Sequence, residues 1–177
     1  MLINIGKKYF LKEDKISRSK SFYLVNPYQK IDKTIIKFLK NFSKNNNRCD
    51  VRVCLHTSPK DKHHDMIVLQ NKKHFHPPHK HLDAGDTIYC INGILGCFIF
   101  KDNGEIKYSC KIKSGEMFKV KHKIYHCLMP LTDTVSFLET RAGPFNPNKK
   151  ILIPKWCPNL NNLLLIDKFK KKLLKFL

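Results

Sequence analysis

The sequence predicts a mainly β protein built on one antiparallel barrel or sandwich, with a helix on either side of it along the chain. Residues 48–145 hold about eight short segments rich in β-branched and aromatic residues, separated by turn signals such as Asn92-Gly93 and Asn103-Gly104. Strands spaced in this way, without helical patterns between them, are typical of antiparallel architectures. The 177 residues, of which 42% are hydrophobic, suit a single domain with one core.

Two amphipathic helices are expected outside the strand-rich segment. Between Gln29 and Ser43, apolar residues recur at spacings of three and four, which predicts a helix with one buried stripe. From Leu160 to Leu177, an apolar face lies opposite a row of lysines, so this basic helix can pack on its own domain, on a second copy or weakly on a membrane surface. We therefore divide the chain into an N-terminal arm and helix at 1–47, a barrel at 48–147 and a C-terminal extension at 148–177.

Three histidines and an aspartate have spacings that fit a metal site on β-structure. Two prolines exclude a helix just before His79, and residues two apart on a strand share a face, so His79 and His81 are expected to point the same way. Asp86 begins the next strand segment, and His126 falls on or beside a later one. These four side chains can converge on one divalent metal.

The same residues resemble the two sequence motifs of the cupin superfamily. The ligand positions of both motifs are filled at the correct spacing, whereas several turn positions differ: Lys73 stands where the first motif has a glycine, and Lys121 and Lys123 replace a proline and a glycine of the second. The resemblance implies a single cupin barrel, that is, a double-stranded β-helix or jelly roll. The matching positions are His79, His81, Asp86, Gly93, Gly115 and His126.

A narrower resemblance covers residues 48–158 and is to the WbuC family of cupin-fold metalloproteins. That family is associated with bacterial surface-polysaccharide gene clusters, which implies a sugar or a nucleotide-linked sugar as substrate. The segments that carry the resemblance are Arg52-Val-Cys-Leu-His56, Pro78-His-Lys-His81, Phe137-Leu-Glu139, Ala142-Gly-Pro-Phe145 and Lys155-Trp-Cys-Pro158.

Other polar residues are candidates for the walls of the cavity. On regular strands Arg52 shares a face with His56, and Glu139 shares one with Arg141. We expect His56 and Glu139 to be catalytic residues that move a proton, and Arg52 and Arg141 to bind substrate. The alternative is that Glu139 and an arginine simply form a buried ion pair.

The proposed ligand set leaves several chemistries open. Three neutral imidazoles and a carboxylate suit Fe, Mn, Ni, Co or Zn and fill four positions of an octahedron, which leaves two for water or substrate. The first hypothesis is an isomerase or epimerase that transfers a proton through an enediolate or similar carbanion. The alternatives are an Fe(II)-dependent oxygenase and a non-catalytic carbohydrate-binding or regulatory module.

Composition limits the partners and the compartment. The formal charge is +20, but thirty of the thirty-four basic residues are lysines, and no nucleic-acid-binding element is visible, so we expect solvated surface lysines that attract an anionic nucleotide-sugar rather than specific nucleic-acid binding. No apolar run is long enough to span a membrane. Seven cysteines without a Cys-x-x-Cys pair indicate a reducing compartment, and we expect a cytoplasmic protein. Apolar stripes near both termini, together with the cupin resemblance, predict a homodimer.

Overall fold

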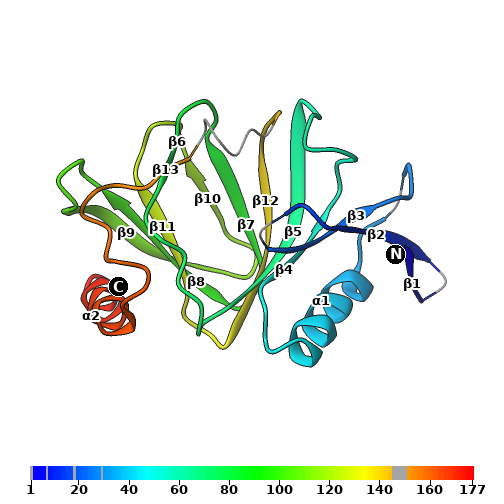
Figure 1. The fold of residues 1–177 in the computed structure, drawn as a ribbon, viewed down its shortest axis with the longest axis horizontal. Helices are drawn as coiled ribbons and strands as arrows, with labels where there is room; N and C mark the ends of the chain where they lie inside the picture. Colours follow the sequence, from blue (N-terminus) through cyan, green and yellow to red (C-terminus); the bar gives the residue numbers. More distant parts are fainter. Residues whose placement is uncertain (1, 7, 18, 29, 145–150) are drawn as a thin grey trace.

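The predicted mainly β fold is confirmed in the computed structural model, which describes residues 2–6, 8–17, 19–28, 30–144 and 151–177 (Figure 1). Both expected helices are present in that part of the chain. The helices are α1 (Lys33–Asn45) and α2 (Leu163–Leu174). The strands are β1 (Leu2–Ile5), β2 (Tyr9–Asp14), β3 (Lys20–Leu24), β4 (Val51–Cys54), β5 (His63–Asn71), β6 (Lys80–His81), β7 (Asp86–Asn92), β8 (Ile94–Phe100), β9 (Ile106–Lys113), β10 (Met117–Val120), β11 (His126–Pro130), β12 (Thr134–Ala142) and β13 (Ile151–Leu152).

Most strands belong to two sheets. The larger has the order β1-β2-β3-β4-β5-β12-β7-β10, the smaller has the order β11-β8-β9, and β13 pairs with β6 separately. The neighbours are antiparallel except β3 and β4, which are parallel, and α1 is the crossover that joins them. The N-terminal arm therefore extends the sheet across the boundary expected at 47/48, while the boundary at 147/148 lies outside the described residues.

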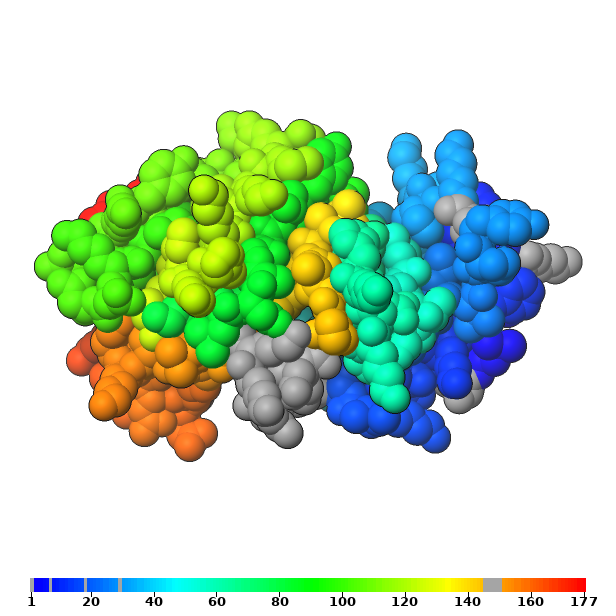
Figure 2. Space-filling model, turned by 90° about the horizontal axis from the view of Figure 1, so that it is seen from above, coloured from blue at the N-terminus to red at the C-terminus, as the bar shows by residue number. Residues whose placement is uncertain are grey.

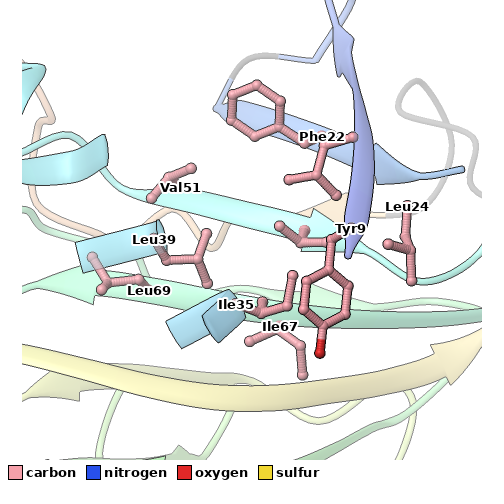
Figure 3. Close-up of a cluster of buried hydrophobic side chains, with 10 residues drawn as sticks. Tyr9, Phe22, Leu24, Ile35, Leu39, Val51, Ile67 and Leu69 are labelled. Carbon is pink, nitrogen blue, oxygen red and sulfur yellow. The ribbon is translucent and has the colours of Figure 1, made fainter. Parts of the chain in front are cut away.

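The central strands of the larger sheet bury both of their faces. On β5, Ile67 and Leu69 belong to a core shared with α1 and the N-terminal strands (Figure 3). Met66 and Val68, one residue out of phase, pack with Phe137 in a second core together with residues of the smaller sheet. Because successive residues of a strand point to opposite faces, β5 needs a cover on each side. Helix α1 supplies the outer cover.

Helix α1 has clear sequence reasons for its limits and its orientation. The carboxylate of Asp32 caps it by accepting a hydrogen bond of 2.8 Å from the backbone N–H of Thr34. Its apolar stripe is fully buried at Ile35 and Leu39. Beyond the helix, Asn47 and Arg48 adopt left-handed backbone angles, with φ of 54° at each, where the chain turns back toward β4.

The C-terminal helix packs on the barrel of its own chain. Leu173 is buried in a third core that includes Phe100 and Tyr125, and Phe169 and Trp156 pack against that core. The ring centroids of Trp156 and Phe100 are 5.0 Å apart. The N-terminal strands and residues 151–177 lie at opposite ends of the molecule (Figure 2). Within the described residues, neither helix is long and apolar enough to cross a membrane.

Asp50 fastens the segment that leads into the predicted metal site. One carboxylate oxygen accepts the backbone N–H of Asn71 at 2.7 Å and lies 2.9 Å from Nδ1 of His74. The other oxygen lies 2.9 Å from Nε2 of His76. One acidic side chain therefore joins the start of β4, the end of β5 and the approach to His79.

Replacing Asp50 by asparagine is expected to lower the free energy of unfolding at pH 7 by about 1–3 kcal/mol, since charge-assisted hydrogen bonds are lost. Burial raises the pKa of Asp50, but hydrogen bonds from His76 and Asn71 outweigh it and leave the pKa lowered. A lowered folded-state pKa stabilises the protein above the ordinary carboxyl pKa, and this contribution disappears as the pH falls through the folded value. Urea unfolding from pH 7 to below 4 should show the difference shrinking. Asp102→Asn, at a side chain that is 90% exposed, should change little at either pH.

Gly104 and Gly115 form a matched pair of turn glycines with φ of 89° and 90°. A Cβ at Gly104 would lie 2.8 Å from the indole of Trp156, whereas a Cβ at Gly115 would meet nothing within 4 Å. Both alanine variants should lose about 1 kcal/mol to the left-handed backbone, and Gly104→Ala should lose a further 1–3 kcal/mol, roughly, to the clash. Urea unfolding followed by tryptophan fluorescence measures both losses. Equal losses in the two variants would show that the Trp156 indole does not pack against Gly104.

Candidate metal centre

Backbone hydrogen bonds hold the strand segments of the predicted ligands together. His79 and His126 form an isolated antiparallel bridge, with N–H to carbonyl distances of 3.0 and 2.9 Å in the two directions. His126 opens β11, and His81 ends the short strand β6. Lys123 occupies the turn before His126 with a left-handed φ of 62°, and its N–H donates to the carbonyl of His81 at 2.6 Å. Lys123 thus adopts the left-handed conformation that glycine favours, so the turn forms although lysine replaces the glycine of the second motif.

The three histidines converge. One ring nitrogen from each of His79, His81 and His126 lies within 4.8 Å of the other two. The rings of His79 and His81 have centroids 4.9 Å apart, so the two side chains do lie on the same side. His81 and His126 are each 4% exposed, and Asp86, which opens β7, is 3% exposed. The four side chains expected to form the site therefore come together in the interior, from three separate segments.

Hydrogen bonds to backbone carbonyls orient two of the imidazoles for coordination. Nδ1 of His79 lies 2.9 Å from the carbonyl of Pro77, and Nδ1 of His126 lies 3.0 Å from the carbonyl of Ile124. A carbonyl only accepts, so Nδ1 of each neutral ring must carry the proton. Nε2 of His79 and of His126 is then left with a free lone pair, as in metal-ligating histidines. Burial, followed by the neighbouring His126, lowers the pKa of His79 to about 3, which keeps this ring neutral.

Asp86 supplies the negative charge of the site. Its Oδ2 lies 2.9 Å from Nε2 of His81 and 3.5 Å from Nε2 of His126. Its Oδ1 is buried without a hydrogen-bond partner, and Nε of Arg141 is 3.7 Å away. Burial raises the pKa of Asp86, but contacts with His126 and His81 and the charge of Arg141 keep it well below its usual range.

The donor set fits a divalent first-row metal. In the neutral form of His126 with its proton on Nδ1, Nε2 and Oδ2 of Asp86 are two acceptors 3.5 Å apart, and a cation between them would satisfy both. Neutral imidazole and carboxylate together suit Fe, Mn, Ni, Co or Zn. His81 differs from the other two rings, because its Nδ1 lies 3.0 Å from Nη2 of Arg141.

The four residues predicted to act beside the ligands, namely Arg52, His56, Glu139 and Arg141, have different surroundings. Glu139 and Arg141 lie on the same side of β12, and Glu139 interacts electrostatically with Asp86 and His81. Arg52 donates to the hydroxyl of Ser21 at 3.2 Å and to that of Ser17 at 2.8 Å.

His56 lies beyond the end of β4, so the strand-parity argument for its orientation does not hold. Its ring stacks on His64 at 4.1 Å and packs edge-on against Tyr23 at 5.8 Å.

Two residues of this region were not expected from the sequence. His64 is not among the candidate residues of the sequence analysis, but β5 begins at His63, and His64 is 3% exposed. Strand parity with Met66 and Val68 is a signal that could have placed it inside. Tyr23 comes from the N-terminal arm, and no local pattern predicts that β3 pairs with β4.

These features define a mainly β protein with a cupin fold and a cluster of three histidines, of which His81 and His126 are buried. A family model described as a domain of unknown function, DUF6016, matches residues 31–112. No curated protein matches the sequence.

Several solved structures are similar to this chain. CapF bound to 3-isopropenyl-tropolone is 14% identical, with a TM-score of 0.50 over 60% of this chain and 31% of CapF. KdgF from Halomonas sp. is 16% identical, with a TM-score of 0.44 over 56% of this chain and 82% of KdgF. The oxalate decarboxylase of Lactobacillus farciminis in complex with formate is 15% identical, with a TM-score of 0.44 over 52% of this chain and 27% of the decarboxylase. The matched region thus spans under a third of the CapF and decarboxylase chains. At such identities the similarity concerns the fold alone, and the cupin fold expected from the two motifs is confirmed.

Proposed function

We propose that this protein binds one divalent transition metal through His79, His81, Asp86 and His126, and that it acts there on a small anionic sugar substrate. The observation that carries the proposal is the convergence of three ring nitrogens within 4.8 Å, inside the fold and beside a buried carboxylate. A buried anion facing imidazole lone pairs is costly unless a cation is shared between them. Burial also shields the site from bulk water, which strengthens every charge interaction within it.

The reaction we favour is proton transfer in an isomerase or epimerase. A bound divalent ion would supply Lewis-acid polarisation of a substrate carbonyl, which acidifies the adjacent C–H. Burial raises the pKa of Glu139, and the charge of Asp86 raises it further, against the opposite effects of Arg141 and Arg52. A carboxyl group with a raised pKa can accept a proton and return it near neutral pH. Glu139 is therefore the preferred proton carrier.

His56 is the weaker of the two candidates for proton transfer. Its Nδ1 lies 3.1 Å from the carbonyl of Asp65, and its ring is stacked on His64 and packed against Tyr23. Burial, followed by the charge of His64, lowers the pKa of His56. These contacts suit a wall of the cavity that holds a neutral ring in place.

Positive charge supports an anionic substrate. Arg52 is oriented by the hydroxyls of two serines, and its planar fork suits a phosphate or carboxylate. The formal charge of +20 adds a general attraction for anions. A nucleotide-linked sugar of surface-polysaccharide synthesis is the substrate class that the WbuC resemblance implies.

The predicted homodimer rests on apolar stripes near both termini, and the predicted weak membrane contact rests on the C-terminal helix, whose exposed apolar residues bear on both. Leu163 is 76% exposed and Leu164 is 74% exposed, although α2 buries its opposite side on the barrel. Sedimentation of the full chain, alone and with anionic vesicles, separates the two predictions.

Metal content gives the first test of the proposal. Protein purified without chelators should carry about one transition metal per chain, and His126→Ala should weaken binding by about a hundredfold or more, because one ligand and its oriented lone pair are removed. His122→Ala, at an exposed histidine four residues earlier in the chain, should bind as the wild type does. Equal binding in both variants would contradict the ligand assignment. Bound iron accompanied by substrate-dependent oxygen uptake would support the oxygenase alternative instead.

Isotope exchange tests the proposed chemistry. In D2O, metal-loaded protein should introduce deuterium at a carbon next to the carbonyl of a keto-sugar or nucleotide-sugar, measured by NMR across a panel of substrates. Glu139→Gln should slow this exchange by about a hundredfold to ten-thousandfold, since the group that moves the proton is lost. Its metal content should stay unchanged. Glu105→Gln, at a surface side chain that is 60% exposed, serves as the control. Full exchange activity in Glu139→Gln would assign the proton to another residue.

A further inference from the structure

Arg141 contacts two members of the proposed ligand set at the same time. Its Nη2 lies 3.0 Å from Nδ1 of His81, and its Nε lies 3.7 Å from Oδ1 of Asp86. The residue sits in the middle of the sheet, where β12 pairs it with His64 of β5 on one side and with Asp86 of β7 on the other. It is 8% exposed. Strand register therefore places the backbone of Arg141 beside Asp86, whereas His81 comes from β6, which pairs with β13.

The contact with Arg141 determines which nitrogen of His81 carries the proton. A guanidinium group has only N–H donors, so Nδ1 of His81 must accept. The proton of the neutral ring is then on Nε2, which lies 2.9 Å from Oδ2 of Asp86 and donates to it. His79 and His126 have the opposite arrangement, because carbonyl groups hold their protons on Nδ1. His81 is thus the one member of this histidine cluster whose inward nitrogen has no free lone pair.

A metal ligand needs that lone pair. Coordination through Nε2 moves the proton of the neutral ring to Nδ1, where it would point at an N–H of Arg141 only 3.0 Å away. Two donors cannot share this contact, and the added positive charge of the ion further repels the guanidinium. Either the ion or the guanidinium can occupy the His81–Asp86 pair, but not both in this arrangement.

We propose that Arg141 competes with the metal for His81 and Asp86, so that the ion-free site is held by the guanidinium and metal loading displaces it. This inference rests on the proposed function of the site as a metal centre. Glu139, two residues away on the same face of β12, is a carboxyl toward which the displaced guanidinium can turn. Metal loading would thereby redirect Arg141 from the ligands toward the group proposed to move the proton.

Arg141→Gln tests the competition directly. Glutamine has no charge, and its side-chain oxygen can accept the Nδ1 proton of a metal-bound His81. We expect the variant to bind Co²⁺ and Zn²⁺ about tenfold to a hundredfold more tightly than the wild type, the range that corresponds to loss of one charge-assisted hydrogen bond from the ion-free state. Affinities are measured with a competing chelator at neutral pH. Arg48→Gln, which removes the same charge from an exposed position, should match the wild type.

The outcomes separate this inference from the proposed function. Binding by both proteins with equal or weaker affinity in Arg141→Gln overturns the competition and leaves the metal centre standing. Absence of binding in both overturns the metal centre and the competition with it. If Arg141 serves only as a structural ion pair, Arg141→Gln will lose stability without any gain in metal affinity, and the competition is overturned.

NMR of the wild-type protein provides a test that needs no variant. Ring nitrogen chemical shifts distinguish a protonated from a bare nitrogen. Without metal, His81 should carry its proton on Nε2, whereas His79 and His126 carry theirs on Nδ1. With Zn²⁺ bound, His81 should change to the Nδ1 form, and the other two should not change. Three identical tautomers in the metal-free protein would overturn the inference.

Discussion

The pair of backbone hydrogen bonds between His79 and His126 is the constraint on which the proposed site depends. It joins two segments that are far apart in the sequence and sets the separation of their side chains. The carbonyls of Pro77 and Ile124, each two residues before its histidine, then fix the ring orientations. Backbone groups therefore orient the rings of His79 and His126. The orientations of His81 and Asp86 depend instead on contacts between side chains.

The rest of the fold can be understood as support for that bridge. The long pairing of β5 with β12 places Arg141 opposite His64, and the pairing of β12 with β7 places it opposite Asp86. Because β5 is apolar on both faces, the sheet needs α1 on its outer side, and the N-terminal strands extend this cover. Asp50 connects the cover to the approach of His79 through His74 and His76. The stability of the outer layer and the placement of the candidate ligands are thus linked.

The electrostatic balance of the site rests on few charges. Asp86 is the acidic group in contact with the histidine cluster, and it is shared among His81, His126 and Arg141. Glu139 lies close enough for the charge of Asp86 to raise its pKa. Two neighbouring carboxyl groups thus have pKa values shifted in opposite directions, which is the arrangement on which the proposed proton transfer relies.

The sequence by itself determined the strand-rich class and both amphipathic helices, because strand and helical periods are local, and its motif spacing indicated His79, His81, Asp86 and His126 as candidate ligands. It did not determine that the N-terminal arm would join the sheet through a parallel pair, that His64 would be buried or that Tyr23 would reach His56. Nor did it predict that Arg141, expected to bind substrate, would contact one of the candidate ligand histidines, His81. Those features arise from pairings between distant segments, whose partners and register depend on how the whole chain packs rather than on any local pattern.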